Sequence, residues 1–150
     1  MTPFQPRDPY DWAALLALIK RAFARMEGRI DPPSSLNLLT AEKLAHHEGE
    51  IWVIGQPPHA CMLLTPMPHA LHLGKLSVDP RYHRKGLAHT LIALAETRAR
   101  DMGLPALELR SRIELVENHA IFFAMGFKQT GATAHPGFDH PTSLTFTKAL

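Results

Sequence analysis

Hydrophobic residues in the first part of the chain recur at the spacing of a helix with one buried face. The pattern predicts a helix over residues 8–26, with Asp8 as its N-terminal cap. The positions at the helical spacing are Trp12, Leu15, Leu16, Ile19 and Phe23. The segment 28–39 cannot continue the helix because it contains Asp31-Pro32-Pro33-Ser34-Ser35. A second, short helix is expected over residues 40–48.

After residue 50 the pattern changes to β-type runs interrupted by a long helix. Strands are expected at 51–55, 60–65, 70–78, 106–109, 127–133 and 143–148, with a possible further strand at 2–4. Helices are expected at 86–102, where apolar residues share one face and Gly103 follows, and at 118–125. Because this order contains one strand–helix–strand crossover, it predicts a mixed α/β sheet with helices on its faces.

The composition is that of an ordinary folded domain. The chain has 150 residues, of which 45% are hydrophobic and 20% charged, and its net charge is +2. We therefore expect one domain over residues 1-150 with its own core, and not a disordered chain. The longest apolar run, Trp12–Ile19, is far shorter than the roughly 20 residues that cross a bilayer. Pro3, Pro6 and Pro9 precede any apolar core of a signal peptide, so we expect a soluble, cytoplasmic protein without a membrane partner.

The cysteine and histidine positions argue against disulfide and metal chemistry. Cys61 is the single cysteine, which excludes an internal disulfide, and its apolar neighbours predict a buried, inert thiol. Among the histidines, His46 and His47 lack the spacing of an H-E-x-x-H motif. His135 and His140 fall in a turn rich in Pro and Gly. No metal site is expected.

The segment 78–88 has the composition of an anion receptor. A strand ends there, a basic run follows, and a glycine and an alanine open a long amphipathic helix. The first turn of a helix offers unpaired N–H groups and about half a positive charge, and small residues let a phosphate approach them. Arg81, Arg84 and Lys85 add full charges, which suits a diphosphate better than a single carboxylate. A solvated basic turn before an ordinary helix is the alternative interpretation.

Three segments carry a family resemblance. His83-Arg84-Lys85-Gly86-Leu87-Ala88 is similar to the [QR]-x-x-G-x-[GA] acetyl-CoA signature of the GNAT superfamily of N-acetyltransferases, with His83 in place of the usual Gln or Arg. Residues 73–80 resemble the L-x-V-x-P strand end of that family, and residues 117–127 resemble its E-N-x-A-x-x-Y-x-x-x-G-F segment. The resemblance implies a single-domain α/β fold with a mixed, mostly antiparallel sheet, helices on both faces and a splayed central strand pair.

The resemblance also implies how acetyl-CoA would bind. The pantetheine arm would lie in the splayed gap and pair with backbone groups of residues 76–78, while N–H groups of residues 84–89 would hold the pyrophosphate. A backbone N–H near Val78 would stabilise the oxyanion at the thioester carbonyl, which can lower the barrier by about 3 kcal/mol. The implied cofactor-binding residues are Leu76, Ser77, Val78, His83, Arg84, Lys85, Gly86, Leu87, Ala88, His89, Asn118 and Phe122. Asn118 is expected first of all to cap its helix.

One position departs from the family pattern. The family commonly has a tyrosine that protonates the leaving thiolate, and here that position is Phe122. Because a thiol has a pKa near 8.5, it can leave as thiolate at modest cost around neutral pH. Ser77, His119 and water are alternative proton donors, and the spacing does not choose between them.

The base that deprotonates the attacking amine is left open. His72 and Lys75 lie on the strand that leads to the signature, and one face of that strand can aim His72 into the cleft. Glu108 and Glu114 are comparable candidates. The family often contacts acceptors with the loop that corresponds to residues 31–35. The candidate catalytic residues are therefore Val78, His72 and Ser77.

The resemblance implies an acyltransferase, namely an acetyl-CoA-dependent N-acetyltransferase acting on a primary amine whose identity stays open. The amine would attack directly in a ternary complex, so no enzyme nucleophile is needed. A CoA-binding module without turnover is the alternative, which Phe122 and the missing base favour. Nucleic-acid binding through residues 81–85 is disfavoured, because these basic residues occupy one turn with only Tyr82 interleaved. A homodimer is possible, as in many such proteins.

Overall fold

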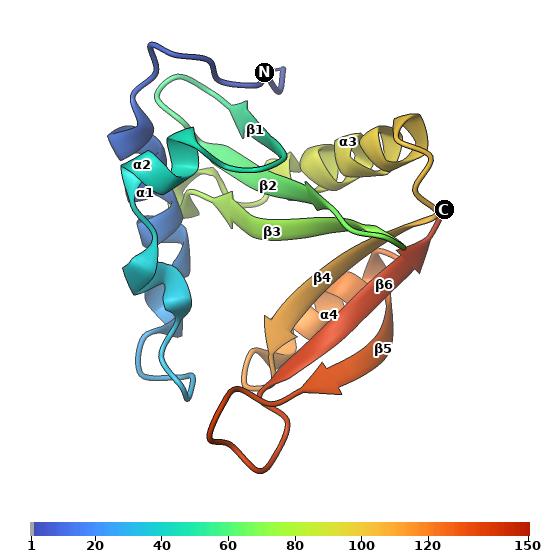
Figure 1. The fold of residues 1–150 in the computed structure, drawn as a ribbon. Helices are drawn as coiled ribbons and strands as arrows, with labels where there is room; N and C mark the ends of the chain where they lie inside the picture. The colour runs from blue at the N-terminus through green and yellow to red at the C-terminus, as the bar shows by residue number, and fades with distance from the viewer. Residues whose placement is uncertain (1) are drawn as a thin grey trace.

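One six-stranded sheet runs through the molecule, with helices on both of its faces (Figure 1). The computed structural model describes residues 2–150. In chain order the elements are α1 (Trp12–Phe23), η1 (Ala24–Met26), η2 (Ser35–Leu38), α2 (Ala41–Ala45), β1 (Glu50–Ile54), β2 (Ala60–Pro66), β3 (Leu71–Val78), η3 (Pro80–Tyr82), α3 (Leu87–Asp101), β4 (Ala106–Arg112), α4 (Val116–Ala124), β5 (Lys128–Thr133) and β6 (Ser143–Ala149). The strand order is β1-β2-β3-β4-β6-β5, and only β3 and β4 are parallel. The predicted mixed, mostly antiparallel α/β fold is confirmed.

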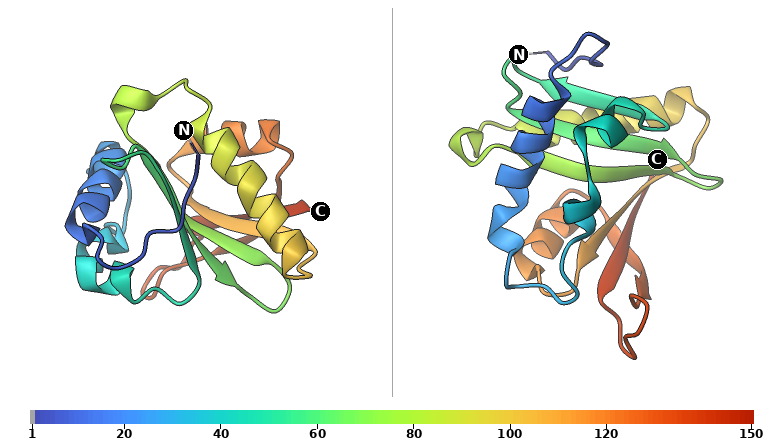
Figure 2. Two further views of the ribbon diagram at one scale, coloured as in Figure 1. Left: turned by 90° about the horizontal axis from the view of Figure 1, so that it is seen from above. Right: turned by 60° about the vertical axis from the view of Figure 1, so that its left-hand side comes forward.

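Strand β2 explains why the sheet needs helices on both faces. Cys61 and Leu63 belong to a buried cluster with α1 and α2. Ala60, Met62 and Leu64 belong to a second cluster with α3. An unbroken apolar run in a strand therefore corresponds to burial on both sides. Figure 2 shows α1 and α2 on one side of the sheet and α3 and α4 on the other.

The sheet opens between β3 and β4. Within residues 2–150 these strands pair only where Leu71 and His72 lie opposite Leu107 and Glu108. Beyond that point β3 continues with β2, whereas β4 continues with β6, and the two strands diverge (Figure 1). The splayed central strand pair is thus present, and it divides the sheet into two halves.

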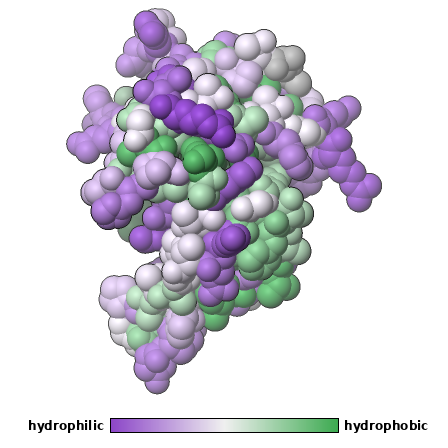
Figure 3. Space-filling model, turned by 90° about the vertical axis from the view of Figure 1, so that its right-hand side faces the viewer, coloured by the Kyte–Doolittle hydropathy of each residue, from purple (hydrophilic) through white to green (hydrophobic). Residues whose placement is uncertain are grey.

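Helix α4 covers the second half of the sheet and leaves part of its own surface apolar. Val116, Ile121 and Phe123 are exposed, while Phe122 and Phe123 both pack against the Phe146 ring on β6. The face of the molecule in Figure 3 has its hydrophobic residues gathered toward one side, and hydrophilic residues cover much of the rest.

The N-terminal region differs from its prediction in two details. Helix α1 begins at Trp12 because Asp11, and not Asp8, is its cap: the Asp11 carboxylate accepts from the backbone N–H of Ala14 at 3.0 Å. Asp8 accepts from the Trp12 indole at 2.7 Å instead. The last turn, Ala24–Met26, is a 3₁₀ turn and not a continuation of the α-helix.

Two further elements also differ from the predicted bounds. Helix α4 starts at Val116 with Leu115 as its N-cap residue, so Asn118 lies inside the first turn and does not cap the helix. Strand β4 extends beyond residue 109 to Arg112, because β6 pairs with all seven of its residues and satisfies the backbone of its polar end. The possible strand at 2–4 is reduced to one bridge between Phe4 and Val53.

Candidate functional site

Strand β3 contains an extra residue where it passes β2. Cys61 lies opposite Ser77, whereas Leu63 lies opposite Gly74, so three steps along β3 match two steps along β2. Lys75 lies in this bulge at φ +50°, in the left-handed region. A bulge bends its strand and increases the local twist, which helps to separate the end of β3 from β4.

The edge of β3 that faces the gap is open. Among the described residues, β3 has no strand partner on that side over residues 73–78. An edge of this kind exposes alternate N–H and C=O groups that pair readily with an extended chain. The backbone is therefore arranged to accept a linear ligand with amide groups.

Helix α3 begins directly beyond that open edge. Gly86 precedes it at φ +73°, a conformation that favours glycine, and Arg84 also lies in the left-handed region at φ +64°. Within residues 2–150 no side chain caps the helix, and its first turn contains no acidic residue. A Cβ on Gly86 would meet nothing within 4 Å, so the space in front of the helix is open. This end of α3 therefore has the features that suit an anion.

The gap and the helix end share one cavity of about 770 Å³. Of the residues predicted from sequence, it brings together His72, Leu76, Val78, His83, Arg84, Gly86, Leu87, Ala88, His89, Asn118 and Phe122. We call residues 76–89 the helix wall of this cavity. The opposite side, the loop wall, consists of residues 25–35 and 110–118.

Several residues considered for the site lie outside the cavity lining, namely Ser77, Arg81, Lys85, Glu108, Glu114 and His119. The Ser77 hydroxyl is buried and donates to the Lys75 carbonyl at 2.8 Å, on the strand itself. Lys85 is exposed at the surface. Arg81 pairs with the buried carboxylate of Asp79, which also accepts from Arg21. These guanidinium groups hold the pKa of Asp79 well below its usual range, so the turn is fixed by a charged pair and not by a ligand.

His72 lies at the point where the two halves of the sheet separate. Its Nδ1 is 3.4 Å from Oε1 of Glu108, its partner in register on β4. Burial lowers the pKa of His72, while the Glu108 carboxylate opposes that effect and Arg110 adds to it. A neutral imidazole beside a carboxylate at the wall of a cavity is suited to accept a proton.

Asn118 and Phe122 project from α4 to the cavity. The Asn118 side-chain oxygen accepts from Arg25 at 3.4 Å. Phe122 is half-buried, with its ring centroid 6.1 Å from that of Phe127 and 5.6 Å from that of Phe146. Phe122 is thus part of an aromatic cluster and contributes no proton donor to the cavity.

Polar contacts join the two segments of the loop wall, residues 25–35 and residues 110–118, to each other. The Arg112 guanidinium donates to the carbonyl oxygens of Pro32 (2.6 Å) and Pro33 (3.2 Å). Arg29 forms a two-pronged ion pair with Glu117, with distances of 2.7 and 3.0 Å. These contacts bring Ser34 and Ser35 from the loop between the first two helices to the cavity.

Some cavity residues escaped the sequence analysis. Arg25, Arg112 and Ser111 line the cavity, and the buried Ser111 hydroxyl has no hydrogen-bond partner within residues 2–150. Only their place in space makes them notable, since no motif includes them. Glu114, a candidate base, does not line the cavity, and one of its oxygens accepts from the backbone N–H of Asp31 at 3.2 Å. Burial raises the pKa of Cys61 to about 12, in agreement with an inert thiol.

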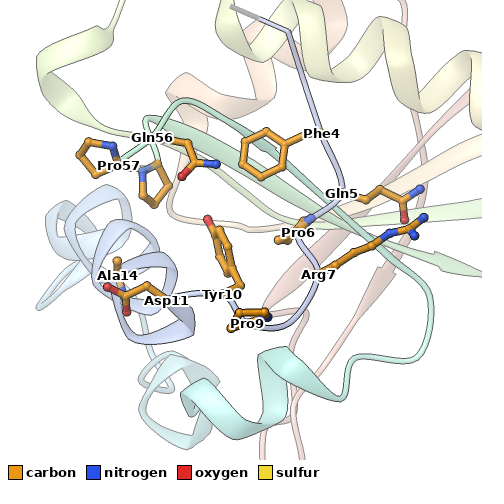
Figure 4. A pocket seen from close by; sticks show the side chains of 11 residues that line it. Phe4, Gln5, Pro6, Arg7, Pro9, Tyr10, Asp11, Ala14, Gln56 and Pro57 are labelled. Atoms are coloured by element: carbon orange, nitrogen blue, oxygen red, sulfur yellow. The ribbon is translucent and has the colours of Figure 1, made fainter.

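A second cavity, of about 460 Å³, lies between the N-terminal segment and the turn after β1. Figure 4 shows the Tyr10 ring in the middle of this cavity, with Pro9 on one side of it and Gln56 and Phe4 on the other. It includes none of the site residues predicted from sequence. Within the described part of the chain, no three His, Cys, Asp or Glu side chains gather to hold a metal ion. Residues 2–150 also contain no helix with the length and apolar character of a membrane span.

Comparison with known proteins agrees with this geometry. Residues 12–127 match the family model described as acetyltransferase (GNAT) family. An acetyltransferase from Streptococcus agalactiae 2603 superposes with a TM-score of 0.77 at 18% identity, over 99% of this chain and 98% of that chain. PaiA N-acetyltransferase from Thermoplasma acidophilum, solved with coenzyme A, gives a TM-score of 0.76 at 15% identity over 100% of both chains.

A third similar structure is the ribosomal-protein-S18-alanine N-acetyltransferase from Escherichia coli. Its TM-score is 0.71 at 17% identity, over 99% of this chain and 92% of that chain. No curated protein matches the sequence significantly. At such identities, the structural likeness establishes the shared fold.

Proposed function

This chain belongs to the acetyltransferase (GNAT) family, and from that premise we propose that it transfers the acetyl group of acetyl-CoA to a primary amine. The observation that carries the proposal is the single cavity in which the open edge of β3 leads to the uncapped start of α3. A strand edge and a helix N-terminus in line suit a ligand that has an amide-containing arm and a diphosphate.

Acetyl-CoA is the substrate whose parts fit these features. The open backbone over Leu76–Val78 is suited to the pantetheine amides, with a backbone N–H near Val78 as the donor to the thioester carbonyl. The N–H groups of residues 84–89 are suited to the pyrophosphate, with Arg84 adding a full charge. Gly86 and Ala88 keep the start of α3 free of bulky side chains that would hold a phosphate away.

His72 is the residue that we assign as the base. The amine nitrogen must lose a proton to attack, and His72 accepts it directly or through water, with Glu108 orienting the ring. The new N–C bond forms at the acetyl carbon as the C–S bond breaks, and the sulfur leaves with the bonding electrons. The products are an N-acetylated amine and CoA, and the released proton returns to solvent or to the thiolate.

No side chain is assigned to protonate the leaving sulfur. The Ser77 hydroxyl donates within its own strand, and Phe122 has no proton to give. Departure as a thiolate is compatible with a thiol pKa near 8.5, because at pH 7 the thiolate is then only about 2 kcal/mol less stable than the thiol.

A CoA-binding module without turnover is the second candidate, and Phe122 favours it. It differs from the enzyme in one measurable way: CoA would bind, but no amine would release the thiol. The catalytic proposal in turn draws support from His72, which lies at the cavity and beside a carboxylate.

Two measurements on the purified protein test the proposal. Calorimetric titration with CoA is expected to give saturable heat at one site per chain. Acetyl-CoA with a panel of primary amines is expected to release free thiol above the rate without amine. Binding without thiol release across the panel would favour the module, and the absence of binding heat would overturn both readings.

A further inference from the structure

The cavity wall is positively charged. Among the described residues no Asp or Glu lines it. Its lysine and arginine lining residues are Arg25, Lys75, Arg84, Arg110 and Arg112, and four histidines lie among them. Arg84 belongs to the helix wall, where a diphosphate accounts for its charge. The other four lie elsewhere and need a different explanation.

These four cations are poorly neutralised by the protein. Arg112 donates to two backbone carbonyls, and Arg25 donates to the Asn118 amide oxygen, so both face neutral partners. Arg110 reaches Glu108 only at 3.9 Å. Lys75 forms no ion pair within residues 2–150, although its ammonium lies 5.9 Å from the centroid of the Phe23 ring.

The carboxylates nearby are engaged elsewhere. Glu117 is held by Arg29 at 2.7 Å, and Glu108 lies beside His72 at 3.4 Å. Glu114 accepts from the loop backbone and does not line the cavity. Without a bound ligand, the positive charge of Lys75, Arg110 and Arg112 is therefore only partly balanced by the protein, through the long contact between Arg110 and Glu108.

Lys75 lies on a different face of the sheet from the diphosphate site. Its side chain reaches Phe23 on α1, whereas α3 packs on the opposite face. It projects from the bulge of β3, between His72 and Val78, beside the region proposed for the thioester. Lys75 and Arg112 line the same cavity, and burial, with the charge of Arg112 as a second cause, lowers the pKa of Lys75.

We propose that the acceptor is a small amine that also carries a carboxylate, bound through Lys75 on β3 and Arg112 on the loop wall. This rests on the proposed acetyl transfer and names its second substrate by class. A bare alkylammonium would enter a wall of like charge, whereas an amino carboxylate brings the anion that neutralises it. The carboxylate accepts from Lys75 and Arg112 while the amine is presented toward His72 and the thioester.

Matched amines test the proposal, with free thiol as the readout. Phenylalanine, phenylalanine amide and phenethylamine share one ring and one amine, and only the first carries an anion. β-Alanine with propylamine and glutamate with γ-aminobutyrate extend the series to other shapes. We expect kcat/KM to be at least tenfold higher for phenylalanine and for β-alanine than for their partners without a carboxylate. We expect the same advantage for glutamate, which has an additional carboxylate next to its amine, over γ-aminobutyrate.

Variants at Lys75 identify the recognising group. Lys75→Asn removes the charge with a residue that tolerates positive φ, and it should reduce the preference for the carboxylate about tenfold while the affinity for CoA stays unchanged. Lys75→Arg should retain the preference. Lys128→Asn, on the exposed strand β5, is the matched control and should change neither quantity.

The outcomes separate this inference from the proposed function. Thiol release with phenethylamine or phenylalanine amide as fast as with phenylalanine overturns the anionic acceptor and leaves acetyl transfer standing. CoA binding without thiol release from any amine overturns both. A preference for the carboxylate that survives Lys75→Asn with the fold and CoA binding intact overturns the assignment to Lys75.

Discussion

The helix wall and the loop wall of the cavity are stabilised by contacts of different range along the chain. In the helix wall, Asp79 pairs with Arg81, two residues away, and the Thr90 hydroxyl donates to the Gly86 carbonyl, four residues away. Asp79 also has one side-chain contact of long range, its pairing with Arg21, 58 residues away. In the loop wall, Arg29 reaches Glu117 across 88 residues, and Arg112 reaches Pro32 across 80. One wall is thus largely a local structure, whereas the other exists only when distant segments meet.

The difference has a functional counterpart. A wall that is built locally can keep the same ligand site in chains that otherwise differ, and here it presents backbone groups to a diphosphate. A wall built from long-range side-chain contacts changes with each of its members, and here it presents Arg25, Arg110 and Arg112. We therefore expect variants of the two walls to separate coenzyme affinity from acceptor affinity.

Substitution of His72, which lies where β3 and β4 separate, should have the largest effect on catalysis. His72→Ala is expected to lower kcat about 100-fold, the usual contribution of a positioned base, with little change in CoA affinity. Burial lowers the pKa of His72, so the acid limb of kcat/KM should lie below the ordinary value of about 6.5. Along this limb kcat/KM should rise with pH, because the neutral imidazole that accepts the proton forms as pH rises.

Glu108→Gln checks the sign of that pH dependence. The Glu108 carboxylate raises the pKa of His72, so its removal lowers that pKa further. The acid limb should then move to lower pH, and it should be absent in His72→Ala. A limb at the same pH in all three proteins would mean that another group titrates.

Gly86→Val breaks the helix wall alone. A β-branched residue at φ +73° is strained by about 1–2 kcal/mol, and its side chain would occupy the open space in front of α3. We expect CoA affinity to fall more than tenfold by calorimetry. Gly103→Val is a close control, because Gly103 has φ +72°, equally open surroundings and a place at the other end of the same helix. Equal losses of affinity in both variants would attribute the effect to strain and not to the phosphate site.

The same contrast explains what the sequence could and could not predict. The end of β3, the glycine before α3 and the order of the elements follow from local patterns, and the structure agrees with them. The splay itself was expected only from the family resemblance, since no local pattern determines that β3 and β4 pair through His72 and Glu108 and no farther.

The loop wall escaped prediction because its members are ordinary surface residues in the sequence. Arg25 and Arg112 belong to no motif, and they meet only when α1 and β4 are placed on the same sheet. Arg81 is the opposite case. Its place beside the phosphate motif suggests a charge for the anion site, but in the structure it pairs with Asp79. The early stop predicted for β4 has a similar cause, because pairing with β6 outweighs the polar residues at its end.

Arg112→Leu breaks the loop wall alone. It removes the two hydrogen bonds that hold the Pro32 and Pro33 carbonyls and one of the cations of the cavity. Because hydrogen bonds to a charged group contribute about 1.5–3 kcal/mol, we expect KM for the acceptor to rise about tenfold. CoA affinity should stay within about twofold, and Arg100→Leu on the exposed side of α3 should affect neither. A parallel loss of CoA affinity would show that the walls are not independent.

Phe122→Tyr adds a proton donor at the position where the family resemblance expects one. We expect kcat to rise about threefold, since an acid helps only modestly when the thiol can leave as thiolate at small cost, and we expect CoA affinity to stay unchanged. Single-turnover rates with acetyl-CoA measure the effect directly. A lower kcat in a folded protein would mean that the ring packs against Phe146 too closely for a hydroxyl to be accommodated.

Tyr10→Phe lies outside both walls and should change stability only. The Tyr10 hydroxyl is buried, has no hydrogen-bond partner within residues 2–150, and has its pKa raised to about 12 chiefly by burial, so it is neutral and unpaired. Removing an unpaired hydroxyl should leave the free energy of unfolding unchanged or raise it by about 1 kcal/mol, as measured by urea titration. The aromatic contacts with Phe4 and Trp12 remain, since they involve only the ring. A loss of stability would instead indicate that the hydroxyl is hydrogen-bonded to water in the second cavity. A change in KM for acetyl-CoA or for the acceptor would show that this second cavity is coupled to the cavity between β3 and β4.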